Sequence, residues 1–221
     1  MYYQLFNDNE YYNFYYIKYI EKISDKSKVK MLNITYSNIT LLNLSKFINL
    51  EILYCNNNNL INLKGLTQCI NLKELYCENN NLTNLNELNK LNKLSVLYCR
   101  KNNLTELPDL SNLNNLTYIL CDNNKIHTLP NNLNNVSTLH CSYNNLTYLP
   151  DLSKCINLND LYLHNNVIKT IVLSILKCKN LTCYKKYNLY THLDELTYLL
   201  NLSIKKYYYS NIIKYYNNKI L

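Results

Sequence analysis

The sequence predicts a right-handed α/β solenoid in which short repeats stack into one parallel β-sheet. An eleven-residue segment recurs along the chain, and successive copies begin 20 or 22 residues apart. Within each copy, apolar residues hold the first, fourth, sixth and eleventh positions. One such copy cannot bury its apolar face alone, so neighbouring copies must stack. The copies begin at Leu50, Leu72, Leu94, Leu116, Val136 and Leu158.

The segments LEILYCNNNNL from Leu50 and LKELYCENNNL from Leu72 match the pattern L-x-x-L-x-L-x-x-N/C-x-L. Cys replaces the third Leu in five of the six copies. This pattern resembles that of leucine-rich-repeat proteins over roughly two thirds of the chain. Further degenerate copies begin at Val29 and Leu181. The register predicts strands near residues 52–55, 74–77, 96–99, 118–121, 138–141 and 160–163, facing a concave side.

The second half of each repeat carries apolar residues three apart, as in Leu82, Leu85 and Leu88. This spacing favours tight turns or 3₁₀ segments over long helices. Prolines recur at one place in three repeats and oppose a helix there. They are Pro108, Pro130 and Pro150. We therefore expect mostly non-helical convex turns, similar to the short-repeat classes of bacterial proteins and phosphatase regulators.

The two ends of a solenoid need caps, because the terminal repeats otherwise expose their apolar interior. Apolar residues from Tyr16 to Ile23 have helical spacing, and Thr191 with Asp194 resembles a capping box. We expect helical caps at both ends. The predicted parts are an N-terminal cap at 1–28, the solenoid at 29–181, and a basic, Tyr-rich C-terminal cap at 182–221.

The net charge of +8 is concentrated near the C-terminus. Residues 31–176 hold ten Lys and Arg against nine acids, whereas residues 177–221 hold eight Lys against two acids. A nearly neutral repeat body does not predict binding to a phosphate backbone. The basic tail IKKYYYSNIIKYYNNKIL leaves nucleic-acid binding open as an alternative, although a solvated capping face is the preferred interpretation.

The chain contains no apolar stretch of eighteen residues, and its start lacks the apolar core of a secretory signal. Its nine cysteines are an odd number and fit a reducing compartment. We therefore expect a cytoplasmic monomer without a membrane span.

Two positions of the repeat are expected to have structural roles, and each forms a column when the repeats stack. The Asn at the ninth position is expected to turn inward and bond backbone groups of its own and neighbouring turns. The Cys at the sixth position, from Cys55 to Cys141, is expected to fill the core as a small apolar residue without binding metal. The Asn column consists of Asn58, Asn80, Asn102, Asn124, Asn144 and Asn166.

The fifth position supplies a mostly aromatic stripe on the concave side, because alternate residues of a strand face the same way. Exposed aromatic surface is typical of protein-binding sites. In the alternative interpretation, the rings only stack across rungs and stabilise the sheet. The predicted partner-binding residues, including a neighbour at the third position, are Tyr54, Tyr76, Tyr98, Tyr118, Leu120, His140 and Tyr162.

Catalytic chemistry is not predicted. Of the four histidines, His140 and His164 should share a face, but we expect no nucleophile beside them. The single glycine, Gly65, excludes a glycine-rich phosphate loop. We expect no cofactor.

The sequence therefore predicts a scaffold that binds an unidentified protein through its concave face. A regulatory subunit of an enzyme such as a phosphatase is the other alternative. The phrases at Asn102–Pro108 and Asn144–Pro150, with the Asn-rich composition, resemble leucine-rich-repeat proteins of large amoeba-infecting DNA viruses. This resemblance implies a protein of the host cytoplasm.

Overall fold

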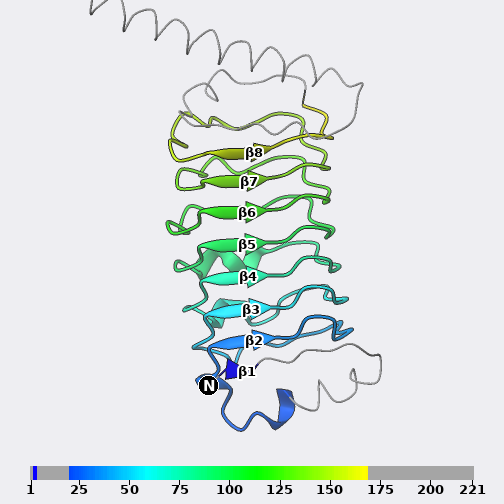
Figure 1. Ribbon diagram of the computed structural model, residues 1–221, viewed down its shortest axis with the longest axis vertical. Helices are drawn as coiled ribbons and strands as arrows, with labels where there is room; N and C mark the ends of the chain where they lie inside the picture. Colours follow the sequence, from blue (N-terminus) through cyan, green and yellow to red (C-terminus); the bar gives the residue numbers. More distant parts are fainter. Residues whose placement is uncertain (1, 4–19, 169–221) are drawn as a thin grey trace, which may run out of the picture.

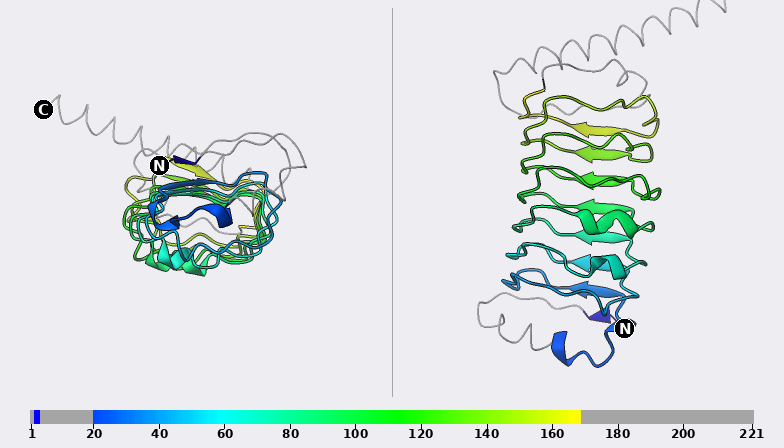
Figure 2. Two further views of the ribbon diagram at one scale, coloured as in Figure 1. Left: turned by 90° about the horizontal axis from the view of Figure 1, so that it is seen from below. Right: turned by 180° about the vertical axis from the view of Figure 1, so that it is seen from behind.

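The computed structural model describes residues 2–3 and 20–168, which form a stack of rungs with one strand in each rung (Figure 1). The eight strands pair in parallel and in chain order within a single sheet. Figure 2 shows that each rung closes into a flattened loop. The strands are β1 (Tyr2–Tyr3), β2 (Met31–Asn33), β3 (Ile52–Tyr54), β4 (Glu74–Tyr76), β5 (Val96–Tyr98), β6 (Tyr118–Leu120), β7 (Thr138–His140) and β8 (Asp160–Tyr162).

The predicted α/β solenoid and its register are confirmed. All six strands expected from the repeat are present, each ending one residue before the predicted end. The degenerate copy from Val29 supplies β2. Equivalent positions lie side by side in adjacent rungs, so Tyr54 pairs with Tyr76 and Tyr76 with Tyr98.

The strands form where apolar and outward-facing residues alternate. In β4, Leu75 is fully buried while Glu74 and Tyr76 are half-buried on the opposite side. Burial of one Leu side chain contributes about 1.5–3 kcal/mol, and this gain recurs in every rung. The sheet is therefore stabilised by a continuous Leu-rich core between the strands and the turns behind them.

Cysteine completes this core at the sixth repeat position. Cys55, Cys77, Cys99, Cys121 and Cys141 all have 0% exposure, which confirms the predicted burial. The seven cysteines of the described residues, which also include Cys69 and Cys155, are free thiols.

The side opposite the sheet consists mostly of turns, as expected from the apolar spacing of three. Two 3₁₀ segments occur there, η3 (Leu66–Gln68) and η4 (Asn86–Lys90), and Figure 2 shows them behind the strands. Each rung thus closes through short turns, and the strands of successive rungs pair in one sheet.

The N-terminal end contains a strand that the sequence did not predict. Within residues 1–28, β1 pairs with β2, whereas residues 4–19, where most of the predicted helix falls, lie outside the described residues. The strand covers the backbone edge that β2 would otherwise expose. Residues 20–22 are helical and η2 (Lys26–Lys28) is a 3₁₀ turn. The predicted C-terminal cap at 182–221 lies outside the described residues.

The asparagine column joins successive rungs through its side chains. The amide nitrogen of Asn80 donates to the carbonyl oxygens of Cys55 (2.9 Å) and Cys77 (3.1 Å). Its Oδ1 accepts from the backbone N–H of Leu60 at 2.9 Å. With a further bond to the Glu78 carbonyl at 3.2 Å, one side chain therefore bonds four backbone groups at a bend in the chain. Equivalent bonds recur at Asn58, Asn102, Asn124, Asn144 and Asn166.

The residue just before each of these asparagines adopts a left-handed backbone. Its φ lies between 51° and 57°, a region that Asn tolerates better than most residues. Asn holds this position in four of the six repeats, and Lys101 and Tyr143 hold it in the other two. The bend thus accounts for part of the unusually high Asn content.

Candidate functional site

The third, fifth and seventh residues of each repeat project from the side of the sheet that faces away from the core. We call this surface the concave face. Its third-position column is Ile52, Glu74, Val96, Tyr118, Thr138 and Asp160. Its fifth-position column is Tyr54, Tyr76, Tyr98, Leu120, His140 and Tyr162. Its seventh-position column is Asn56, Glu78, Arg100, Asp122, Ser142 and His164.

Three tyrosines on β3, β4 and β5 form a continuous aromatic surface, which we call the tyrosine ladder. The rings of Tyr54 and Tyr76 are stacked, with centroids 4.6 Å apart and planes 12° apart. The rings of Tyr76 and Tyr98 meet edge to face at 4.9 Å and 79°. The rung spacing of about 4.8 Å places successive rings in contact. The stacking considered as an alternative is therefore present, and it holds the rings in a fixed arrangement.

Tyr76 is also fixed by a bond along its own strand. Its hydroxyl donates to Oε2 of Glu74 at 2.8 Å. Burial and the Glu74 carboxylate raise the pKa of Tyr76 above its ordinary value. The hydroxyl therefore stays protonated and remains a donor near neutral pH.

The aromatic stripe predicted from the fifth position is interrupted on β6. Leu120 is only 6% exposed, so its assignment as an accessible binding residue was wrong. Its neighbours in register are Tyr98 and His140, whose rings are larger than a Leu side chain. Tyr118, in the adjacent column, is 44% exposed and supplies the aromatic surface of this rung instead.

A charged cluster joins three rungs next to the ladder, formed by Arg100, Asp122 and His140. Arg100 Nε lies 2.6 Å from Asp122 Oδ2, although its N–H is not aligned for a hydrogen bond. Arg100 Nη2 lies 2.7 Å from His140 Nδ1. Because a guanidinium only donates, Nδ1 accepts and the proton of neutral His140 is on Nε2. Burial lowers the pKa of His140, which favours this neutral form.

His140 also contacts the far end of the aromatic surface. Its ring centroid lies 4.0 Å from that of Tyr162 on the next rung. The structure thus places the predicted binding residues in two groups, the tyrosine ladder and the pair of His140 with Tyr162, and the buried Leu120 lies between them in the same column. Sequence reasoning did not predict that Arg100 and Asp122 would pair beside these groups and that Arg100 would contact His140. Their shared seventh position in adjacent repeats was the available signal.

The expectation that no nucleophile lies beside the two histidines was wrong in one contact. Ser142 Oγ is 2.9 Å from His164 Nδ1. However, Ser142 is only 1% exposed, and Asp122 accepts from the Ser142 backbone N–H instead of orienting His164. A serine activated for attack needs both an accessible hydroxyl and an oriented base. This contact therefore stabilises the rungs without forming a catalytic arrangement.

The described residues provide neither a metal-binding cluster nor a membrane-spanning helix. Among residues 2–3 and 20–168, no group of three or more His, Cys, Asp or Glu is placed to hold a metal ion. No helix in this part of the chain is long and apolar enough to cross a membrane.

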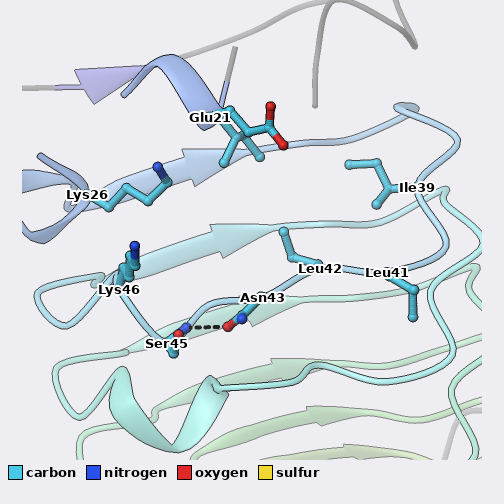
Figure 3. A pocket seen from close by; sticks show the side chains of 9 residues that line it. Glu21, Lys26, Ile39, Leu41, Leu42, Asn43, Ser45 and Lys46 are labelled. Carbon is cyan, nitrogen blue, oxygen red and sulfur yellow. Dashed lines mark hydrogen bonds between the residues drawn. The ribbon is translucent and has the colours of Figure 1, made fainter. Parts of the chain in front are cut away.

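A separate cavity of about 390 Å³ lies at the N-terminal end of the solenoid (Figure 3). Its lining combines the charged side chains of Glu21, Lys26 and Lys46 with apolar ones such as Leu41 and Leu42. None of the predicted binding residues lines it. The concave face therefore remains the surface on which those residues gather.

Comparison with solved structures identifies the architecture. Over 74% of this chain, the fold is similar to an internalin, InlF, of Listeria monocytogenes, with 20% identity and a TM-score of 0.64. It is also similar to YopM, a leucine-rich effector protein of Yersinia pestis, over 66% of this chain, with 32% identity and a TM-score of 0.61. The fold is a leucine-rich-repeat solenoid.

A third similar structure is the functional domain of InlJ of Listeria monocytogenes, which is described as including a cysteine ladder. The match covers 69% of this chain, with 26% identity and a TM-score of 0.58. This chain spans half or less of these solved structures, covering 49% of InlF, 40% of YopM and 36% of InlJ. No protein-family model and no curated protein sequence matches the chain.

Proposed function

We propose that this solenoid is a scaffold that binds another protein through its concave face, and that it acts by binding and not by catalysis. The carrying observation is the tyrosine ladder, an aromatic surface that is formed by residues of three strands and lies beside charged residues. Tyrosines supply large contact area at a low entropic cost of ordering, and this cost falls further when the rings already contact one another. A partner would therefore meet a preorganised surface.

The proposal predicts different roles for the two faces of one strand. Leu75 and Cys77 fill the core, whereas Tyr76 projects outward between them. Truncating Tyr76 and Tyr98 should consequently leave the core intact and remove the centre of the ladder. Central aromatic anchors commonly contribute about 2 kcal/mol or more to binding when truncated to Ala.

The test compares the double variant Tyr76→Ala/Tyr98→Ala with the wild type for both partner capture and thermal stability. Proteins are captured from an extract of the organism that makes the chain, and the affinity of each candidate is then measured in purified form. We expect a partner that binds the wild type and loses at least about thirtyfold in affinity to the double variant.

Tyr148→Ala is the matched control, because Tyr148 is 48% exposed and lies outside the concave face. It should retain full affinity. If the double variant loses thermal stability but binds every partner as tightly as the wild type, the ladder only stabilises the sheet and the proposal is wrong.

Finer predictions accompany this proposal. The buried free thiols support a protein of a reducing compartment such as the cytoplasm. The resemblance to proteins of large DNA viruses rests on the sequence phrases alone and stays a prediction. The two alternative functions, a regulatory enzyme subunit and nucleic-acid binding by the basic tail, also stay predictions. The basic tail lies outside the described residues.

A further inference from the structure

We infer that the solenoid has a second binding site, for a short neutral carbohydrate, in a groove formed by the turns that follow β2, β3 and β4. The groove has a volume of about 340 Å³, within the range of small-molecule sites. It is lined by Tyr36 and by seven asparagines from the eighth, ninth and tenth positions of three successive repeats. None of the columns of the concave face lines it, so this site goes beyond the proposed function.

The lining of the groove contains no charged side chain. An amide side chain offers both donor and acceptor atoms, whereas a carboxylate only accepts and an ammonium group only donates. Hydroxyl groups also do both. The ninth-position amides of Asn58 and Asn80 are buried and already bond backbone groups, so a ligand would meet the amides of the eighth and tenth positions. These amides favour a neutral ligand with many hydroxyl groups over an ionic one.

Two pairs of these amides are held in place by bonds between neighbouring rungs. The side-chain nitrogen of Asn79 donates to Oδ1 of Asn57 at 2.7 Å. The side-chain nitrogen of Asn59 donates in the same way to Oδ1 of Asn38. Within the part of the chain that the structure describes, each pair therefore retains one amide nitrogen and one amide oxygen without a protein partner. A ligand hydroxyl can accept from the first and donate to the second.

Tyr36 adds an exposed aromatic ring to the first of the three rungs. Its ring belongs to a residue that is 63% exposed, and its backbone φ of 56° lies in the left-handed region. This region is uncommon for a bulky residue, and backbone strain of this kind is concentrated at functional sites. Tyr143 holds the same repeat position, but its ring packs on His164. The apolar face of the Tyr36 ring can pack on the C–H groups of a sugar ring.

The asparagines at the tenth position are not required by the fold. Asn59 and Asn81 are exposed, and their backbone N–H groups donate to the carbonyl oxygens of Ile39 and Leu60 at 2.9 Å. Any residue except proline could make these backbone bonds. The same position is held by lysine and valine in later repeats, at Lys125 and Val167. The amide side chains beside the groove are therefore free to serve a ligand.

The dimensions of the groove favour a carbohydrate over a peptide. Three rungs extend over two steps of about 4.8 Å, which is about 10 Å. An extended peptide repeats about every 3.3 Å, so its successive groups cannot match amides that repeat at the rung spacing. A sugar ring carries hydroxyl groups around its edge and does not need that match. In the next rung Lys101 takes the eighth position, so the uncharged surface ends there.

The test uses the full chain and isothermal titration with ligands of known composition. The neutral probes are linear trisaccharides of glucose, of mannose and of N-acetylglucosamine. Trigalacturonate is the anionic comparison, and a short uncharged peptide of Ser and Gly with blocked ends is the peptide comparison. We expect at least one neutral trisaccharide to bind with a Kd below about 1 mM and at least about tenfold more tightly than either comparison.

Tyr36→Ala/Asn81→Ala removes the aromatic ring and one exposed amide from the groove. It should weaken binding of that trisaccharide at least about tenfold, whereas Tyr36→Phe keeps the ring and should retain the affinity. The matched control is Tyr143→Ala/Asn145→Ala, which changes the same two repeat positions outside the groove. It should bind as the wild type does. Thermal unfolding shows that each variant is folded at the temperature of the titration.

Several outcomes would overturn the inference. They are the failure of every neutral trisaccharide to bind more tightly than about 1 mM, tighter binding of trigalacturonate or of the peptide, and unchanged affinity in Tyr36→Ala/Asn81→Ala. The ladder variant Tyr76→Ala/Tyr98→Ala should bind the trisaccharide normally. If that variant alone loses the trisaccharide, the carbohydrate binds the concave face and the groove is not its site.

Discussion

The guanidinium of Arg100 and the carboxylate of Asp122 lie 2.6 Å apart across neighbouring rungs. Their side chains are 36% and 13% exposed, so the pair is partly shielded from solvent. An ion pair at the surface contributes about 0–1 kcal/mol to stability. Removal of one partner of a shielded pair lowers stability by more, because the remaining charge is left without a partner away from water. We expect a double-mutant cycle of Arg100→Ala and Asp122→Ala to give a coupling of about 1–2 kcal/mol in chemical unfolding.

The pair of Lys73 and Glu51 provides the comparison for this prediction. Its atoms are 2.7 Å apart, but the side chains are 55% and 28% exposed. Its coupling should be smaller than that of Arg100 with Asp122 and should disappear in high salt. Equal couplings for the two pairs would show that shielding by the concave face does not strengthen the Arg100 contact.

Asn144 and Asn145 are adjacent in sequence but differ in burial. The Asn144 side chain donates to Cys121 and Cys141 carbonyls at 3.1 Å and accepts from the Ile126 N–H at 3.0 Å, whereas Asn145 is exposed. Asn144→Ala leaves buried backbone groups unsatisfied and should lower the free energy of unfolding by about 1–3 kcal/mol. Asn145→Ala should change it by less than about 0.5 kcal/mol. Similar losses for both variants would argue against the inward role of the Asn column.

Lys101 has a left-handed backbone with φ of 51°, at the position where the next repeat has Asn123 with φ of 57°. Asn accommodates this region better than Lys, because its short polar side chain bonds locally. Lys101→Asn should raise the free energy of unfolding by about 0.5–1 kcal/mol, and Asn123→Lys should lower it by a similar amount. Urea unfolding of the two variants tests both signs, and changes of equal sign would contradict the backbone explanation.

The strands, the core and the inward positions were predictable because each depends on a local pattern repeated at a fixed interval. Leu75 and Cys77 are buried for the same reason as Leu97 and Cys99, so one correct repeat predicts the others. An incorrect alignment of any one repeat would have been inconsistent with the pairing of its strand with the strands of the adjacent repeats.

The exceptions depend on side chains of neighbouring rungs, which a single repeat does not specify. Leu120 occupies an outward position, yet it is covered because larger rings flank it in register. Ser142 contacts His164 only because both occupy the seventh position of adjacent rungs. β1 could not be predicted either, since two extended residues, Tyr2 and Tyr3, are too few to show a repeat.

The buried thiols should be unreactive in the folded protein. Burial raises the pKa of Cys69 to about 12 and the pKa values of Cys77 and Cys121 well above the ordinary value. The thiolate is the reactive form, so alkylation should require unfolding. In a Cys178→Ser/Cys183→Ser variant, which retains the seven described cysteines, we expect slow labelling in buffer and rapid labelling in denaturant. Rapid modification of all seven in buffer would contradict their burial.

The Glu78 carboxyl should make the free energy of unfolding depend on pH, because its ionised form is destabilised by burial. Burial raises the pKa of Glu78, with a smaller opposing effect of Arg100. The folded state therefore holds this proton more tightly than the unfolded state. Stability from this group is complete below the ordinary carboxyl pKa of about 4.3 and is lost as pH rises through the raised folded value.

Glu78→Gln removes this loss, so its stability relative to the wild type should increase between about pH 4 and pH 7. Glu51→Gln should show the opposite trend at lower pH, because bonds from Lys73 and Lys30 lower the pKa of Glu51 in the folded state. The stability of this variant relative to the wild type should therefore decrease as pH rises toward the ordinary carboxyl pKa of about 4.3. Urea unfolding at several pH values measures both differences. If Glu78→Gln is stabilised at neutral pH, then the buried carboxylate opposes folding. Parallel pH trends in the two variants would instead show that Glu78 is not destabilised by burial.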